Sequence, residues 1–326
     1  MNLKYTNFRK KSEQLHNEED FDKALIFLNK AKDYAEGIDE RIDCLYDEAL
    51  ILDEMERNIE SLEAFEKIIE LDGKEAGAYY GKAMILEKLG RREEAERAYL
   101  DCLELDPEYD RAYFYLANLY DIEKKYDMAL ATYQKVLDIV SDDYKTLNNM
   151  GAICESLNRY DEALDLLNRC ININPDYFRA YFNIGVVYGK LDEDDRALKF
   201  YEKAQELNPG HLNCYLNMSA VYLKNRQYMS SINILTKGIK NTDDNANLYY
   251  NRACAKMRLN NDSSALIDLN EACIRHQSLK EYAKEDPDFE RVWADEKFKR
   301  IVGDFDDIFE DRRRHKRHEE GRRNSL

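Results

Sequence analysis

The sequence repeats itself with a period of 34 residues, and this period limits the possible fold more than any other feature. Small residues recur at this step through much of the chain: Ala95, Ala129, Ala163, Ala197, Ser231 and Ala265. Tyrosines and prolines keep the same spacing or twice it: Tyr79, Tyr113, Tyr181, Tyr215, Tyr249, Pro107, Pro175 and Pro209. A fixed period of about 20 to 50 residues indicates stacked copies of one supersecondary unit.

The frame divides residues 5–279 into eight tandem units. They start near Tyr5, Ile42, Ala76, Asp110, Tyr144, Phe178, Leu212 and Ala246, and the first unit is three residues longer than the rest. The eighth position of every unit is small: Ser12, Ala49, Ala83, Ala117, Gly151, Gly185, Ser219 and Ala253. The twentieth is small as well: Ala24, Ser61, Ala95, Ala129, Ala163, Ala197, Ser231 and Ala265. Small residues beside large ones let two helices approach closely and interlock.

Apolar residues within a unit follow two helical stripes. In the fourth unit, the first stripe has the spacing i, i+3, i+4, i+7 and consists of Tyr113, Leu116, Ala117 and Tyr120. The second stripe consists of Leu130, Tyr133, Val136 and Leu137. Each unit is therefore predicted to be two antiparallel helices. The composition agrees, because 12 glycines and 4 prolines in 326 residues are too few for a fold of many short strands.

These residues resemble the tetratricopeptide repeat family, a 34-residue helix-turn-helix. The best match runs through the sixth unit: Tyr181, Ile184, Gly185, Tyr188, Ala197, Tyr201, Ala204 and Pro209. The resemblance implies an all-α fold, a right-handed superhelical α-solenoid of about eight repeats in which the first helix of each pair lines a concave surface. Polar residues replace the usual apolar seventh or eleventh residue in some units, which we expect to pack less tightly: Lys11, Glu48, Lys82, Arg252 and Lys256.

The resemblance also implies a function, a non-catalytic scaffold that binds an extended peptide or protein segment in the concave groove. Position six of four consecutive units faces that groove in the family pattern: Asn149, Asn183, Asn217 and Asn251. A carboxamide both donates and accepts hydrogen bonds, so such a row can pair with a peptide backbone. It is similar to the asparagine ladder of some superhelical family members. The alternative is that each asparagine bonds within its own unit.

Aromatic and basic side chains occupy two further groove positions. The aromatic residues at position five are Tyr46, Tyr80, Phe114, Phe182 and Tyr250, and the basic residues at position two are Arg111, Lys145 and Arg179. Aromatics and arginine are enriched at the energetic centres of interfaces. The alternative for each tyrosine is that it packs between helices.

Three groove residues, Asn118, Asn149 and Arg179, also resemble part of the carboxylate clamp by which some family members hold the acidic tail of a chaperone. Phe114 and Asn183 stand where that clamp has cations. The sequence therefore does not favour a chaperone-tail function.

The chain carries a net charge of −17. Residues 304–326 have seven acidic and seven basic side chains, so the whole net charge lies in residues 1–303. Such a surface repels nucleic acid and anionic membranes, and it favours neutral or basic partners. Solvation of the convex surface explains the same charge equally well.

The period stops after the eighth unit. Residues 280–303 contain the single tryptophan, Trp293, which we expect to share a helical face with Phe289 and Val292 in a capping segment. The run Ala283 to Phe289, with Asp295 and Phe298, resembles the closing segment of many bacterial tetratricopeptide proteins. The tail, 304–326, is acidic and then basic, and its basic cluster 312–323 gives an alternative function: an adaptor that contacts RNA or an acidic partner while the repeats bind a peptide.

Nothing in the sequence predicts an enzyme, a cofactor or a metal site. The five histidines belong to no catalytic motif, and the seven cysteines include no Cys-x-x-Cys pair. No stretch is long and apolar enough for a membrane helix, and the first 16 residues are too charged for a signal peptide, so we expect a cytoplasmic protein.

Overall fold

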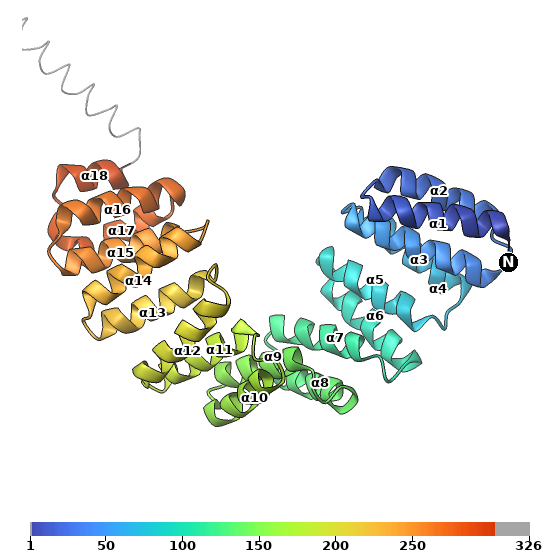
Figure 1. Cartoon of the computed structure of the whole chain (residues 1–326), viewed down its shortest axis with the longest axis horizontal. Helices are drawn as coiled ribbons and strands as arrows, with labels where there is room; N and C mark the ends of the chain where they lie inside the picture. The colour runs from blue at the N-terminus through green and yellow to red at the C-terminus, as the bar shows by residue number, and fades with distance from the viewer. Residues whose placement is uncertain (1, 304–326) are drawn as a thin grey trace, which may run out of the picture. The chain divides into compact units, whose positions relative to one another are not determined.

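The computed structural model of the protein describes residues 2–303 and consists of two compact units, residues 1–146 and 147–326. The basic cluster 312–323 lies outside the described residues. Between residues 2 and 303 every regular element is a helix and no strand occurs. The predicted all-α solenoid fold is thus confirmed (Figure 1). The boundary between the units falls within α9, Tyr144–Ser156, and each unit is described by itself.

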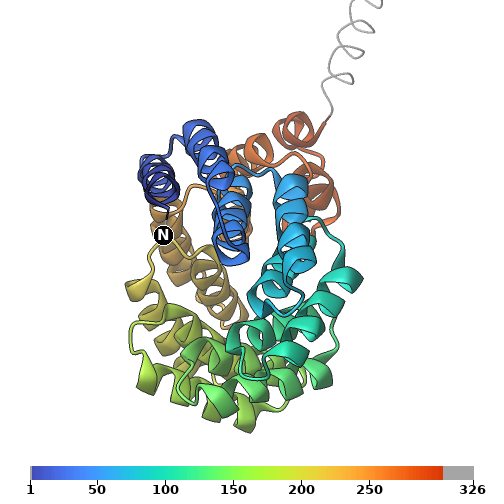
Figure 2. The same ribbon diagram turned by 90° about the vertical axis from the view of Figure 1, so that its right-hand side faces the viewer.

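The first unit is a row of four antiparallel helical pairs (Figures 1 and 2). Its helices are α1 (Leu3–Asn17), α2 (Phe21–Asp33), α3 (Ile38–Glu54), α4 (Asn58–Leu71), α5 (Ala76–Lys88), α6 (Arg92–Leu105), α7 (Asp110–Ile122) and α8 (Tyr126–Ile139). The two helices of a pair pack on each other, and α2, α4 and α6 each pack on the first helix of the next pair.

The second unit continues the pattern and ends differently. After α9 come α10 (Tyr160–Ile173), α11 (Phe178–Lys190), α12 (Asp194–Leu207), α13 (Leu212–Lys224), α14 (Tyr228–Asn241), α15 (Ala246–Arg258) and α16 (Asp262–Arg275). The chain then forms α17 (Leu279–Glu285), the 3₁₀-helix η1 (Pro287–Val292) and α18 (Glu296–Val302). Besides the sequential contacts, α13 packs directly on α11 and on α15. Therefore α11, α13 and α15 lie next to one another, and a hydrogen bond from Asn183 to Asn148 joins α11 to α9. We call the surface of α9 (from Leu147), α11, α13 and α15 the odd-helix face.

The same turn joins the two helices in all eight pairs. One residue in each turn has a positive φ: Glu19, Glu56, Gly90, Lys124, Asn158, Asp192, Arg226 and Asn260. Each of them is the fifteenth residue of its unit. Only Gly90 has the residue type that adopts this left-handed conformation without cost, so packing of the helices on either side fixes the turn in the other seven.

Close packing of the two helices in each pair rests on the small residues predicted for positions eight and twenty. All sixteen are buried, as the pattern predicts. Where serine occupies position eight, its hydroxyl is used at the crossing: Ser12 Oγ donates to the carbonyl of Ala24 at 2.8 Å, and Ser219 Oγ lies 2.8 Å from Ser231 Oγ. A Cβ on Gly185 would lie only 2.7 Å from the Tyr201 ring, so even a methyl group is too large there.

Polar residues at apolar positions are compensated by partners of opposite charge. Arg252 and Lys256 on α15 both contact Asp268 of α16, at 2.8 and 2.7 Å, and the Asp268 side chain is 4% exposed. In the first unit Lys82 lies 3.0 Å from Glu66, and Lys32 pairs with Glu48. The expectation of looser packing in these units is wrong for the last pair, because an ion network fills its interface.

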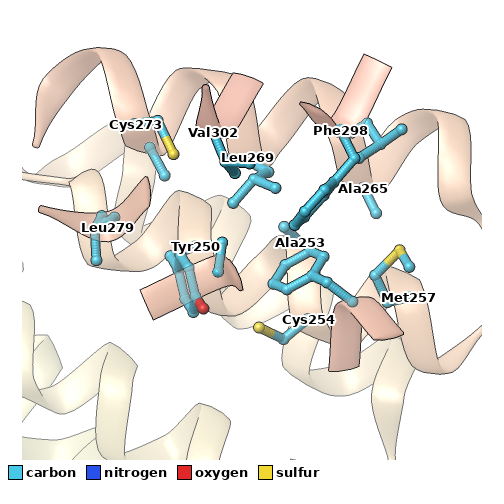
Figure 3. Close-up of a cluster of buried hydrophobic side chains, with 14 of the residues drawn as sticks. Tyr250, Ala253, Cys254, Met257, Ala265, Leu269, Cys273, Leu279, Phe298 and Val302 are labelled. Carbon is cyan, nitrogen blue, oxygen red and sulfur yellow. The ribbon is translucent and has the colours of Figure 1, made fainter. Parts of the chain in front are cut away.

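The end of the second unit is covered by the helices that follow the last pair. Leu279, Phe289, Phe298 and Val302 join the buried cluster of α15 and α16 (Figure 3). Trp293 does not: it is 37% exposed, and its indole Nε1 donates to the carbonyl of Ala283 at 3.4 Å. The expected common face of Phe289, Val292 and Trp293 is therefore wrong for Trp293, because the 3₁₀-helix ends at Val292 and turns the next residue outward.

We predict that Gly151→Leu destabilises the folded chain by about 1 to 3 kcal/mol through overpacking. A Cβ at this position would lie 2.7 Å from Leu167 Cγ. Urea unfolding followed by circular dichroism measures the effect. Gly37→Leu is the matched control, because nothing lies within 4 Å of a Cβ there. Equal stability of the two variants would contradict this account of the crossing.

We predict a larger loss for Asp268→Asn, about 3 to 5 kcal/mol, because Arg252 and Lys256 would keep their charges without a buried counter-ion. Thermal or urea unfolding measures it. Glu296→Gln removes an exposed partner of Lys299 and is expected to change stability by less than about 1 kcal/mol. Similar effects of the two substitutions would show that the Asp268 network is dispensable.

Candidate peptide-binding face

The four asparagines of position six lie on successive odd-numbered helices, one each on α9, α11, α13 and α15. Each side chain is partly exposed. Their helical register places them on the odd-helix face, since each stands two residues before a buried small residue at the crossing with the second helix. The repeat period thus produces a row of carboxamides along the second unit.

Hydrogen bonds link this row to the neighbouring pair of helices. Asn183 Nδ2 donates to Asn148 Oδ1 at 2.9 Å, and Asn148 Nδ2 donates to Asn149 Oδ1 at 3.2 Å. Asn217 Nδ2 donates to the Tyr201 hydroxyl at 3.4 Å. The bonds of Asn183 and Asn217 run to the preceding pair, whereas the alternative drawn from the sequence placed them within one unit. A carboxamide has two N–H donors and an oxygen acceptor, so one such bond does not exhaust its capacity.

An aromatic cluster flanks the row at α11. The Phe182 ring lies 5.7 Å from the Tyr201 ring and 4.8 Å from the His211 ring, and His211 also lies 5.0 Å from Phe178. Burial, and to a lesser degree the charge of Arg179, lowers the pKa of His211 below its ordinary value. Its buried Nε2 has no hydrogen-bond partner among the described residues. Arg179 itself is exposed at the edge of this cluster.

Tyr250 is not an open groove residue as the pattern predicted. It is 8% exposed, its hydroxyl donates to Asp286 at 2.8 Å, and its ring lies 5.7 Å from the Phe289 ring. The physical reason is the capping segment, which covers the last pair of helices where another repeat would otherwise follow. Asn251, on the same helix, keeps a partly exposed side chain.

The predicted groove residues of the first unit form an aromatic group of their own. Tyr80 contacts the rings of Tyr109 and Tyr115 at 5.2 and 6.0 Å, and burial raises its pKa. Phe114 lies 5.9 Å from Tyr133, whose hydroxyl donates to Asn118. These rings pack between helices, which is the alternative that the sequence analysis gave for the tyrosines. The side chains of Tyr80 and Phe114 are nevertheless partly exposed.

The basic residues of position two, Arg111, Lys145 and Arg179, are all exposed. Arg111 and Lys145 belong to the first unit and Arg179 to the second.

Acidic and basic residues are unevenly distributed over the helices of the second unit, and the net charge of the chain does not show this. From Leu147 onward α9, α11, α13 and α15 carry one carboxylate, Glu155, against six bases: Arg179, Lys190, Lys224, Arg252, Lys256 and Arg258. Several of these bases are paired, as in the contact of Lys224 with Asp192 and Asp194 at 2.8 Å. The odd-helix face thus does not have the excess of acidic residues on which the expectation of a basic partner rested. Counting charges helix by helix, rather than over the whole chain, would have found this.

Little else in residues 2–303 offers reactive chemistry. All seven cysteines are buried, and burial raises the pKa of Cys44 to about 11. No cluster of three potential metal ligands occurs in this range. None of its helices combines the length and the apolar character that crossing a bilayer requires.

Comparison with known proteins relates this fold to a protein family. Models of the tetratricopeptide repeat match residues 76–109, 110–176 and 142–210. Structures similar to this chain include PilF of Pseudomonas aeruginosa (21% identity, TM-score 0.56, 69% of this chain and 100% of that one). Another is a tetratricopeptide repeat protein of Parabacteroides merdae (16%, 0.60, 74% and 97%). A third comes from the Cut9–Hcn1 hetero-tetramer of the APC/C (16%, 0.56, 87% and 54%). No curated protein matches the chain.

The architecture is that of an α-solenoid, a stack of helical hairpins. The chain contains tetratricopeptide repeats, which the family models match over residues 76–210. Repeats of this family are typically non-catalytic modules that bind proteins or peptides.

We predict that acid destabilises the second unit through His211. Because the folded chain lowers the pKa of this imidazole, its stabilising contribution is complete above the ordinary histidine value of about 6.5 and is lost as the pH falls below it. Between about pH 7.5 and pH 5, the urea midpoint should fall further for the unsubstituted protein than for His211→Gln. His276→Gln, at an exposed histidine, should keep the full pH dependence. The hypothesis fails if both variants lose it equally.

Proposed function

We propose that this protein is a non-catalytic scaffold that holds an extended segment of another protein against the odd-helix face of the second unit. The observation that carries the proposal is the row Asn149, Asn183, Asn217 and Asn251, one partly exposed carboxamide on each successive odd-numbered helix.

The spacing of the row suits a peptide main chain. Packed helices lie about 8 to 10 Å apart, and an extended chain rises about 3.3 Å per residue. Successive asparagines therefore meet the peptide at about every third residue. Since carboxamides pair with backbone N–H and C=O groups, this mode of binding tolerates many side-chain sequences.

Apolar surface between the asparagines adds contact area. Phe182, Val186 and Leu216 on α11 and α13 each pack against a buried cluster of the second unit and are partly exposed. Arg179 is exposed at one edge and is of the type that anchors interfaces. With Glu155 as its one carboxylate, the face gives a basic segment little to pair with, so we propose a partner segment that is neutral or acidic where it contacts these helices.

On the first unit, Tyr80, Phe114 and Asn118, with Arg111 and Lys145, are proposed as a further contact surface. Partly exposed aromatic rings beside exposed bases support it.

We predict that the triple variant Asn149→Ala, Asn183→Ala, Asn217→Ala weakens binding of a captured partner by roughly 1 kcal/mol for each lost hydrogen bond, on the order of 100-fold in affinity. The partner is captured from lysate, identified by mass spectrometry and reduced to a synthetic peptide. Titration calorimetry with that peptide then compares the variants.

The matched control replaces three exposed asparagines of even-numbered helices, Asn172, Asn233 and Asn270, by alanine. It should bind as the unsubstituted protein does. N-methylation of single peptide amides should weaken binding more than alanine substitution of the same peptide residues, because the main chain is what the asparagines read. Equal affinity of both triple variants, with circular dichroism unchanged, would refute the proposal.

A further inference from the structure

A hollow of about 530 Å³ lies where the odd-helix face meets the capping segment. It is lined by Asn247, Tyr250, Leu279, Tyr282, Glu285 and Asp286. Leu279 and Tyr250 form an apolar floor and are 7% and 8% exposed. Tyr282 at its rim is 68% exposed, an unusual position for so large a side chain in a segment whose other apolar residues are mostly buried. We call this site the cap hollow.

The charge of the cap hollow is negative and is not compensated inside it. Glu285 and Asp286 contribute carboxylates, and none of the lining residues is basic. Asp286 accepts hydrogen bonds from the Tyr250 hydroxyl at 2.8 Å and from the backbone of Asp288 at 2.9 Å, which fixes its orientation. Glu285 is exposed and forms no ion pair with another described residue.

This combination fits the side chain of arginine or lysine. The aliphatic stem covers the floor, the cation lies over the Tyr282 ring, and the carboxylates receive its N–H donors. The odd-helix face carries Glu155 as its one carboxylate, so the cap hollow at its end is the site that selects a base.

The chain itself supplies such a ligand close by. Residues 312–323, RRRHKRHEEGRR, contain seven arginines and lysines, and only eight residues separate them from Gly303. Val302 lies beside Leu269 and Cys273, toward Leu279, whereas Phe298 lies toward Ala265 (Figure 3). The chain therefore leaves α18 at the end nearer to the cap hollow.

The length of the connection is sufficient. α17 and α18 pack on each other, and a helix of seven residues is about 10 Å long, with helix axes about 10 Å apart. The cap hollow on α17 is thus within about 20 Å of Gly303, while eight extended residues reach about 27 Å. The acidic residues 304–311 are repelled by the cap hollow, which leaves the basic cluster as the segment that fits.

We propose that the basic segment 312–323 of this same chain binds in the cap hollow with an arginine or lysine side chain. Asn247 and Tyr250 are residues of α15, so the bound segment covers the last part of the odd-helix face. If the proposed function holds, it competes there with the partner. Binding within the chain stands independently of that function and is tested without a partner.

The test uses the full chain with the photoreactive residue p-benzoylphenylalanine in place of Tyr282. Irradiation of the purified protein, followed by mass spectrometry, should give a cross-link to a peptide from 312–323. Mixing isotope-labelled with unlabelled chains shows whether the link is within one molecule. The control carries the same photoreactive residue at Met229, an exposed site on α14, and should not give this cross-link.

Glu285→Lys in the photoreactive chain should remove most of the cross-link, since it reverses one of the two carboxylate charges of the cap hollow. Hydrogen exchange provides a second measurement: amides of Leu279–Glu285 should exchange more slowly in the full chain than in Arg312→Gln, Arg313→Gln, Arg314→Gln. A cross-link between two chains, a cross-link that survives Glu285→Lys, or the absence of a link together with unchanged exchange would each overturn the proposal.

Discussion

The structure depends on the close crossing of two helices at the small residues of positions eight and twenty. A hairpin of two short helices cannot bury its apolar side alone, so every pair needs a neighbour. Neighbouring pairs can stack only if the two helices of each pair lie close together. This close approach requires small residues at the crossing, such as Ala83 and Ala95, which are both fully buried. Serine is accepted there because its hydroxyl reaches a carbonyl or another hydroxyl, as Ser61 Oγ reaches the carbonyl of Ala49 at 2.8 Å. The sequence therefore repeats because every pair of helices needs the same small residues at its crossing.

The same stacking creates the surface that we assign to binding. Because the odd-numbered helices contact one another, equivalent residues on them form rows, and a row of asparagines is a row of hydrogen-bonding groups with a regular spacing. The bonds of Asn183 to Asn148 and of Asn217 to Tyr201 orient these groups. Orientation before binding lowers the entropy lost when a ligand is held. In our proposal the row thus serves stacking and recognition together.

Features that repeat could be predicted from the sequence, and features that occur once could not. The helical pairs and the small residues at the crossings follow from local spacing, which one repeat after another reinforces. Tyr250 looked like its equivalents Tyr80 and Phe182, but Asp286 and Phe289, which belong to no repeat, cover it. The partner of Arg252 and Lys256 could not be predicted either, because Asp268 looks like an ordinary surface residue until the two helices are paired. The positive φ of residues such as Lys124 leaves no trace in the residue type.

The central claim is that the side-chain amides of the asparagine row contact the main chain of a partner segment. Nuclear magnetic resonance of the ¹⁵N-labelled protein, with side-chain NH₂ signals assigned for Asn183 and Asn217, tests it most directly. On addition of the partner peptide, the account predicts that these NH₂ signals shift and show contacts to peptide backbone protons, while those of Asn233 and Asn270 stay in place. Saturating peptide that leaves the Asn183 and Asn217 signals unmoved would contradict it.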